Sequence, residues 1–261
     1  MKRIHLFEFE DYEWFPNTLR ICMTRYIVAI HKMLGTTPEL KGIVAKALKH
    51  STKPQILDMC SGSGGPMPEV VEELRKEEGN KDLKLTLSDL YPNLSAAKKI
   101  NAKADPKFNY LTEPVDATDV GEGHEGVRTM VCSMHHMPPK VAKKILKSAK
   151  EDRQPICVFE LSDNSIPKFL WWLAIPINII MVLFITPFVR PMSWQQIVFT
   201  YLIPILPLVI AWDGAVSNIR TYTLDDMDEL LEGLESDDYE WEKSTIKGKG
   251  GNRVYLLGLP K

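Results

Sequence analysis

The sequence predicts an α/β fold: a doubly wound, mainly parallel seven-stranded sheet with a terminal antiparallel hairpin, plus an apolar helical insertion. Three observations predict it. Strand-like and helix-like segments alternate up to about residue 160, which is typical of parallel βαβ units. A glycine-rich turn joins the last two strand-like segments. Two uncharged, apolar runs separate these two parts of the chain.

The first elements follow from local signals. Residues 17–34 place apolar side chains on one helical face and stop at Gly35, which predicts a helix lying on another element. Helices that begin at prolines are predicted at 66–78 and 141–149, because a missing amide costs nothing at a helix start. A further helix is expected at 94–104. The five parallel strands are predicted at 54–60, 83–88, 110–116, 127–133 and 155–161.

After the insertion, Thr223 and Asp226 form a capping pattern that predicts a helix start. Residues 239–246 and 253–259 flank a glycine-rich turn, so we expect two antiparallel strands there.

Composition excludes several classes of protein. The 261 residues include 32 basic and 34 acidic side chains, a net charge of -2, which argues against a protein that mainly neutralises nucleic-acid phosphates. We therefore expect no nucleic-acid partner. The four cysteines are widely spaced, so neither a disulfide framework nor a zinc site is predicted. Acidic residues interrupt the N-terminal region before a signal-peptide core could form, which favours a cytoplasmic location.

The stretch with most chemical information is residues 58–65, Asp-Met-Cys-Ser-Gly-Ser-Gly-Gly, between a strand and a helix. Small residues let the backbone approach a ligand, and the next helix start offers free amides. Asp89 ends the second strand, where a carboxylate can accept bonds from ribose hydroxyls. A nicotinamide-dinucleotide dehydrogenase shares these features, but the turn lacks a third glycine three residues after Gly64.

Residues 54–162 and 221–260 resemble the class I S-adenosylmethionine-dependent methyltransferases. Asp58, Gly62 and Gly64 match their first motif, while Cys60 stands where the family usually has its first glycine. The resemblance implies S-adenosylmethionine as cofactor, with Asp89 as the ribose-binding acid and Asp116 at the adenine amino group. The full set of cofactor-binding residues that it implies is Asp58, Cys60, Ser61, Gly62, Gly64, Asp89, Leu90, Asp116, Ala117, Ser133 and Met134.

The resemblance also suggests a domain organisation. Residues 51–164 and 221–261 would form the cofactor-binding domain, 1–50 an N-terminal helical lid, and 165–220 a membrane-associated or lid insertion. Within the lid, Asp11, Tyr12 and Trp14 either close the acceptor pocket or simply anchor the segment.

His135 and His136 are the catalytic candidates. They follow the fourth strand at the edge where open α/β sheets bind ligands, and a neutral imidazole can accept a proton near pH 7. A base is needed only for acceptors that arrive protonated, and the plainer interpretation is that the pair lines the cavity or caps the next helix. Glu160 and Asp163 are expected to be loop carboxylates bound to nearby amides. No metal is expected, because no ligand spacing is recognisable.

Residues 169–189 contain no charge and would span ~31 Å as a helix, whereas 197–212 would span only ~24 Å. The flanking strands belong to one sheet, so only an even number of membrane crossings is allowed. A helical hairpin or a wedge in one leaflet satisfies this, and a soluble lid or a homodimer contact is the alternative. We therefore expect methyl transfer to a lipophilic small molecule at the membrane surface, with a non-catalytic cofactor-binding or scaffold protein as the rival.

Overall fold

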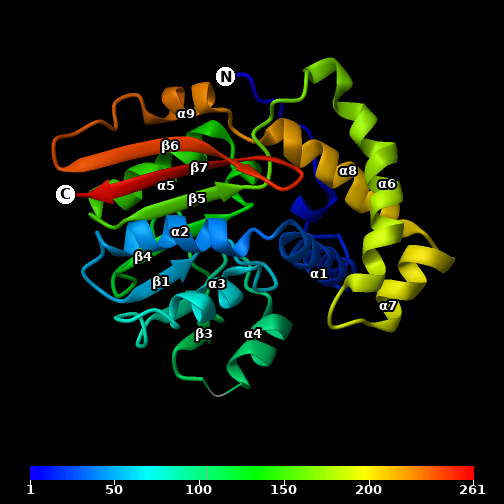
Figure 1. Ribbon diagram of the computed structural model, residues 1–261, viewed down its shortest axis with the longest axis horizontal. Helices are drawn as coiled ribbons and strands as arrows, with labels where there is room; N and C mark the ends of the chain where they lie inside the picture. Colours follow the sequence, from blue (N-terminus) through cyan, green and yellow to red (C-terminus); the bar gives the residue numbers. More distant parts are fainter. Residues whose placement is uncertain (104) are drawn as a thin grey trace.

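Seven strands form one mixed sheet with helices on both faces, in a computed structural model that describes residues 1–103 and 105–261 (Figure 1). The strand order is β3-β2-β1-β4-β5-β7-β6, in which β1 to β5 are parallel and β7 runs antiparallel to both neighbours. This confirms the predicted fold class. The strands are β1 (Gln55–Asp58), β2 (Lys84–Leu87), β3 (Phe108–Tyr110), β4 (Val127–Val131), β5 (Ile156–Glu160), β6 (Tyr239–Gly248) and β7 (Gly251–Pro260).

The third strand corrects the prediction of 110–116. β3 ends at Tyr110, and the chain then leaves the ladder. Pro114 lacks an amide and cannot continue strand pairing, which accounts for the early end. The departing segment still reaches the second strand's end, because the Val115 amide donates to the Asp89 carbonyl at 2.9 Å. Because Asp116 follows Val115 directly, this hydrogen bond places it at the carboxyl edge of the sheet.

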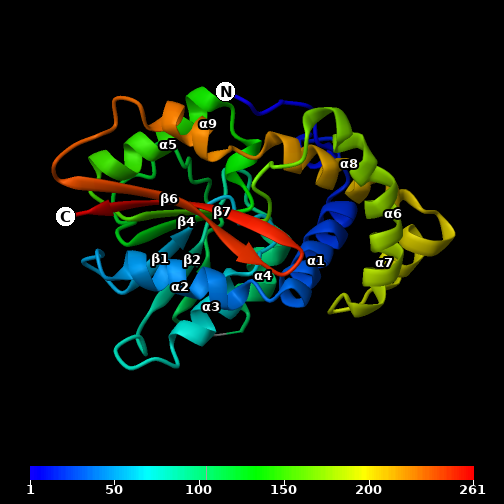
Figure 2. The same ribbon diagram turned by 45° about the horizontal axis from the view of Figure 1, so that its top comes forward.

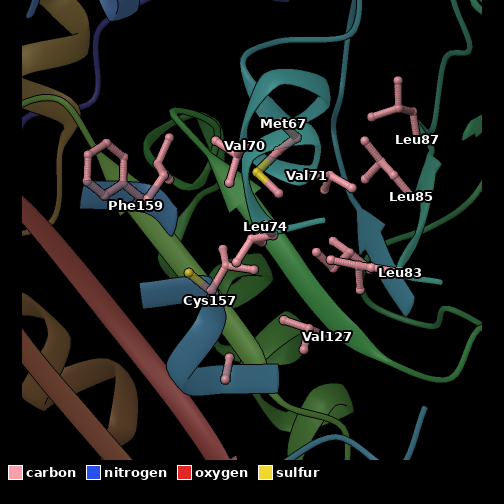
Figure 3. Close-up of a cluster of buried hydrophobic side chains, with 14 of the residues drawn as sticks. Met67, Val70, Val71, Leu74, Leu83, Leu85, Leu87, Val127, Cys157 and Phe159 are labelled. Atoms are coloured by element: carbon pink, nitrogen blue, oxygen red, sulfur yellow. The ribbon is translucent and has the colours of Figure 1, made fainter. Parts of the chain in front are cut away.

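One face of the sheet is covered by α2 (Thr37–Leu48), α3 (Met67–Leu74) and α4 (Leu94–Asn101). Their apolar sides pack on alternate strand residues such as Cys157 and Phe159 of β5 in a buried cluster (Figure 3). The sequence predicts that residues 1–50, which include α2, form a lid. In the structure, the buried residues of α2 belong to the core of the sheet. α4 agrees with its prediction up to Asn101, and the predicted last residue, Ala104, lies outside the described residues.

The opposite face carries α5 (Pro139–Glu151) and α9 (Leu224–Leu231), as the turned view shows (Figure 2). Leu57 and Val158 point to this side and belong to a second buried cluster. Adjacent residues of one strand therefore pack into the cores on opposite faces of the sheet. Thr223 caps α9: its hydroxyl accepts from the Asp226 amide, and the Asp226 carboxylate accepts from the Thr223 amide. The predicted helix start is confirmed.

The insertion and α1 (Asn17–Leu34) form a helical lobe beside the sheet (Figure 1). α6 packs along α8, and both contact α1 around a third buried cluster that includes Tyr26, Val182 and Leu206. Pro204 stands at a break where the chain bends by 86°. The elements of the insertion are η3 (Lys168–Leu173), α6 (Ala174–Ile185), η4 (Thr186–Phe188), α7 (Trp194–Ile197), the π-helical turn η5 (Val198–Leu202) and α8 (Ile205–Arg220).

Candidate functional site

The turn after β1 is held by the buried carboxylate of Asp58. It accepts hydrogen bonds from the Thr129 hydroxyl at 2.6 Å and the Ser61 hydroxyl at 2.7 Å. Burial raises the pKa of Asp58 to about 6, although both hydrogen bonds favour its charged form. Asp58 therefore ties the turn to the neighbouring strand β4.

Asp89 joins the end of β2 to the same turn. One of its carboxylate oxygens accepts from the Gly62 amide at 2.9 Å, and the other accepts from the Tyr91 amide at 2.9 Å. The Tyr110 hydroxyl donates to the Gly62 carbonyl at 2.8 Å. Residues at the ends of β2 and β3 thus fix the position of one exposed glycine in the turn after β1.

The turn needs left-handed backbone at several positions, with φ of 57° at Cys60, 53° at Gly62 and 110° at Gly64. A Cβ atom on Gly64 would lie 3.2 Å from Ile100 Cδ1, so packing as well as conformation favours glycine there. Gly62, by contrast, is exposed with open space around it among the described residues, so a ligand can approach its backbone.

The remaining predicted residues lie along the same edge. Asp116 accepts hydrogen bonds from the amide and hydroxyl of Thr118, both at 2.8 Å. Ala117 follows it and is partly buried, while Leu90 is exposed. Ser133 and Met134 leave β4 and are buried. The structure therefore places every predicted cofactor residue at the carboxyl ends of β1 to β4 or just beyond β3.

Two small cavities, of about 240 and 210 Å³, open beside Gly65. α1 forms a wall of both, through residues that include Val28. One cavity extends towards α3 and the other towards α4, so α1 stands over one side of the glycine turn.

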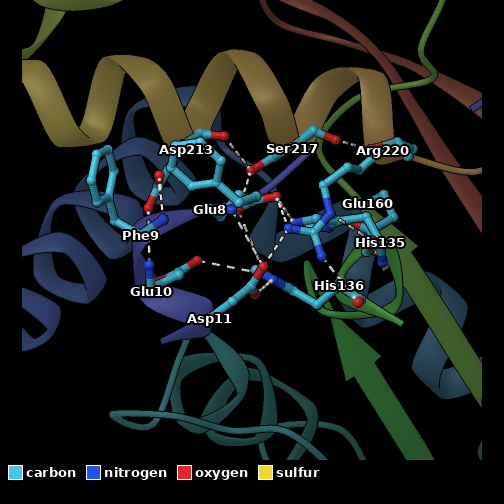
Figure 4. Close-up of polar contacts among 12 residues, drawn as sticks. Glu8, Phe9, Glu10, Asp11, His135, His136, Glu160, Asp213, Ser217 and Arg220 are labelled. Atoms are coloured by element: carbon cyan, nitrogen blue, oxygen red, sulfur yellow. Dashed lines mark hydrogen bonds and ion pairs between the residues drawn. The ribbon is translucent and has the colours of Figure 1, made fainter. Parts of the chain in front are cut away.

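A second assembly gathers acidic and basic side chains from four distant parts of the chain (Figure 4). We call it the Glu8 cluster. Its members are Glu8, Glu10 and Asp11 from the N-terminal segment, which includes η1 (Phe9–Asp11), His135 and His136 from η2 (Met134–His136), Glu160 from the end of β5, and Asp213, Ser217 and Arg220 from α8.

Arg220 and Glu8 form a buried ion pair at the centre of this cluster. Arg220 Nη1 donates to Glu8 Oε1 at 2.9 Å and to Asp11 Oδ2 at 2.7 Å, and Ser217 Oγ donates to Glu8 Oε2 at 3.0 Å. Arg220 Nη2 also donates to the His136 carbonyl at 3.0 Å. The end of the insertion is thereby fixed to the turn that follows β4.

Each candidate catalytic histidine is oriented by a carboxylate. His135 Nδ1 lies 2.8 Å from Glu160 Oε2, and His136 Nδ1 lies 2.7 Å from Asp11 Oδ1. Both Nε2 atoms lie 3.9 Å from an oxygen of Glu8. Burial alone would lower the pKa of His136, but the surrounding carboxylates, Glu8 first, outweigh this and raise it to about 9.

Sequence reasoning missed several members of this cluster. It did not single out Glu8, although that residue is fully buried. The available signal was Asp213 and Arg220, two charged residues in a helix otherwise rich in apolar ones, since buried charges need partners. Glu160 was expected to bind only nearby amides; it does accept from the His135 amide at 3.1 Å, and it also holds the His135 ring.

Neither a family model nor a curated protein matches this sequence. Solved structures do match. The plantazolicin methyltransferase BamL, in complex with a triazolic desmethylPZN analog and SAH, aligns with a TM-score of 0.52 at 11% identity, over 93% of this chain and 97% of that one. The plantazolicin methyltransferase BpumL with SAH gives 0.49 at 12% identity, over 97% and 88%. The mitomycin 7-O-methyltransferase MmcR gives 0.48 at 15% identity, over 87% of this chain and 54% of that one.

The similarity to BamL extends over nearly the full length of both chains, so it concerns the overall fold of the sheet and its helices. The chain therefore has the fold of the class I S-adenosylmethionine-dependent methyltransferases, which confirms the resemblance seen in the sequence.

Proposed function

We propose that the protein is an S-adenosylmethionine-dependent methyltransferase that acts on a lipophilic small molecule at the cytoplasmic face of a membrane. The observation that carries the proposal is the hydrogen bond between the Gly62 amide and the Asp89 carboxylate, formed in a methyltransferase fold. It brings the two most informative sequence signals to one point on the sheet edge.

The cofactor assignment is supported by the chemistry of that edge. Asp89 is half-buried and uses one lone pair on each oxygen for backbone amides, which leaves others for ribose hydroxyls. Asp116 would meet the adenine amino group, and Ser133 and Met134 would lie beside the methionine moiety. The exposed backbone at Gly62 would let the turn contact the cofactor closely.

The acceptor assignment is supported by the insertion. α8 contacts η2, so the apolar lobe adjoins the sheet edge where we place the methyl group. Its surface carries many exposed large apolar side chains, which in water mark a binding surface or a membrane contact. They include Phe169, Trp172, Ile177, Ile180, Phe184, Phe188, Trp194, Leu202, Ile203 and Leu208.

The lengths of the helices favour membrane contact by a wedge or a short hairpin. Residues 168–188 form a helix long and apolar enough to cross a bilayer, and only 17% of its apolar window is buried. Residues 194–202 and 205–220 pass the same test only as a pair, bent by 86°. Sheet strands on both sides of the insertion require both ends to lie in one compartment.

A second candidate is a non-catalytic protein that binds the cofactor and a membrane. It is favoured by the state of the two histidines, because both Nδ1 atoms are engaged by carboxylates and both Nε2 atoms face Glu8. Neither imidazole is thus a free base for a hydroxyl acceptor. Release of S-adenosylhomocysteine in the presence of a lipid extract would separate this candidate from an enzyme.

Calorimetric titration tests the cofactor directly. S-adenosylmethionine and S-adenosylhomocysteine are titrated into the detergent-solubilised wild type, Asp89→Ala and the exposed control Asp237→Ala. Because hydrogen bonds to charged groups contribute about 1.5–3 kcal/mol each, Asp89→Ala should weaken binding at least about tenfold. Asp237→Ala should bind like the wild type. Folded wild type that binds neither compound would overturn the proposal.

A further inference from the structure

We propose that Glu8, His135 and His136 bind a divalent transition-metal ion. Each residue offers one donor atom, and the three donor atoms all lie within 4.8 Å of one another. Two imidazole nitrogens and a carboxylate oxygen suit first-row metals such as Zn²⁺, Fe²⁺ or Co²⁺ better than they suit Ca²⁺ or Mg²⁺. The sequence could not suggest this site, because the carboxylate and the imidazoles are more than a hundred residues apart.

The unpartnered nitrogen of His135 is an independent sign of a ligand. The His135 side chain is 6% exposed, and its Nε2 atom has no hydrogen-bond partner among the described residues. Nε2 faces Glu8 Oε1 at 3.9 Å, too far for a hydrogen bond. A buried polar atom left without a partner is unfavourable, and a metal ion bound to His135 Nε2 would satisfy it.

The surrounding carboxylates prepare the imidazoles for this role. Histidines that bind metal commonly donate their other ring nitrogen to a carboxylate, which fixes the tautomer and the ring orientation. Glu160 does this for His135 and Asp11 does it for His136, at 2.8 and 2.7 Å. The two imidazoles therefore direct their Nε2 atoms towards the same carboxylate, Glu8.

The spacing of the donors fits an ion after small adjustments. Nitrogen and oxygen ligands lie ~2.0–2.2 Å from Zn²⁺, so donor pairs around one ion are ~3–4 Å apart. The two distances from imidazole Nε2 to Glu8 are 3.9 Å, and His136 Nε2 lies 3.5 Å from Glu10 Oε1. Glu10 lies beside His136 but outside this group of three donors, so it would have to move to become a fourth ligand.

The charge of the region also favours a cation. Four carboxylates, of Glu8, Glu10, Asp11 and Glu160, lie around the two imidazoles, and Arg220 donates to those of Glu8 and Asp11. Arg220 holds Glu8 in place, but its single positive charge does not balance the negative charge of these carboxylates. A dication beside the two histidines would reduce that excess where the side chains are most deeply buried.

The proposed ion would bridge the N-terminal segment and the turn after β4. It would lie at the carboxyl edge of the sheet, where a bound metal can lower the pKa of an oxygen acceptor without a free imidazole base. This last consequence rests on the proposed function. Metal binding itself does not, because it is measured without cofactor or acceptor.

The test is direct metal binding by the full chain, untagged and in detergent, after removal of metals with a chelator. Zn²⁺ is titrated by calorimetry, and Co²⁺ by its visible absorption, which reports nitrogen and oxygen ligation. We expect one ion per chain. His136→Ala should weaken affinity more than about 100-fold. Glu160→Gln, which removes the charge and replaces one of the two acceptors for His135 with an amide donor, should weaken it by about 10–100-fold. The control His124→Ala, in a surface loop, should bind like the wild type.

His136→Ala is the decisive variant because His136 is partly exposed, so its loss leaves less of the core unpaired than that of His135. Circular dichroism establishes that it is folded. Folded wild type that binds no Zn²⁺ or Co²⁺, or His136→Ala with wild-type affinity, would overturn the metal site. S-adenosylmethionine titrated into the same preparations separates the two proposals, since either can fail while the other stands.

Discussion

Cys60 illustrates how a single residue can conflict with its backbone. Its φ of 57° lies in the left-handed region, where a side chain other than glycine costs ~1–2 kcal/mol. Its side chain packs against the buried cluster beneath α5, which offsets part of this cost. The family usually has glycine at this position, and the observed conformation supplies a physical reason for that preference.

We expect Cys60→Gly to raise the free energy of unfolding by up to about 1 kcal/mol, because it removes the backbone strain at the expense of a small apolar contact. Cys60→Val should lower it by more than about 1 kcal/mol, since β-branched residues tolerate this region least. Urea denaturation of the three proteins measures both changes. Equal stability of the glycine and valine variants would contradict the assigned backbone conformation.

At the same scale, the glycine turn could be predicted and the Glu8 cluster could not. Asp58, Gly62 and Gly64 lie within seven consecutive residues, and their spacing alone indicates a strand, a turn and a close backbone approach. Glu8 and Arg220 are 212 residues apart, and their pairing depends on how the insertion folds back. No local pattern carries that information, so the acceptor side was less predictable than the cofactor side.

At the scale of elements, His31 links the end of α1 to its neighbours. His31 Nδ1 lies 2.7 Å from the Thr36 hydroxyl at the start of α2, and Nε2 lies 3.6 Å from Cys132 Sγ beyond β4. The ring is buried, and burial lowers its pKa from 6.5 to about 4. Arg253 acts in the same direction. His31 therefore remains neutral in the folded protein near pH 7.

This depressed pKa predicts a pH dependence of stability. Between about pH 6.5 and 4 the unfolded chain binds a proton that the folded His31 does not, so acid favours unfolding. The free energy of unfolding contains the full contribution of neutral His31 above about pH 6.5. This contribution falls by about 3 kcal/mol as the pH drops to about 4. Denaturant unfolding at a series of pH values measures it.

His31→Gln is the matched variant, because glutamine can still hydrogen bond to Thr36 but does not titrate. Other groups also titrate in this range, so the informative quantity is the difference between the two proteins. We expect the wild type to lose about 3 kcal/mol more than the variant between pH 7 and pH 4. Parallel stability curves would show that His31 is not buried in a neutral form.

The elements differ in how far local sequence determines them. The start of α9 could be predicted because its capping box consists of two residues three positions apart. α2 is not among the predicted helices although Pro38 and Glu39 are helix-start signals, because its 12 residues give a shorter apolar pattern than the 18 residues of α1. β3 ends earlier than predicted because its length depends on pairing with β2, which the local sequence does not encode.

At the scale of the whole molecule, the sheet domain is polar outside while the insertion is apolar outside. In the insertion, Phe184 and Leu202 are each 73% exposed. Sequence indicated the apolar runs but not which side chains face outward, because a helix that is apolar all round gives no directional signal. The structure shows which side chains face outward: one side of the lobe packs on α1, and the side chains of the other side are exposed.

We therefore expect the wild type to bind vesicles of neutral phosphatidylcholine, because residues 169–189 carry no charge and apolar burial would provide the affinity. Phe184→Asp and Leu202→Asp should each weaken binding at least about tenfold, since burying such a side chain contributes ~1.5–3 kcal/mol and the new charge opposes insertion. Flotation of the protein with vesicles measures the bound fraction.

Leu94→Asp is the matched control, because Leu94 is also an exposed leucine but begins α4, on the sheet domain. It should bind vesicles like the wild type. The rival explanation, a homodimer formed through the same apolar surface, makes a different prediction. The wild type would then be a dimer by light scattering without detergent and would not bind vesicles. The Phe184→Asp variant would be a monomer. That outcome would remove the membrane from the proposed function and leave its cofactor assignment intact, since the cofactor assignment rests on Gly62 and Asp89 and not on the exposed apolar side chains.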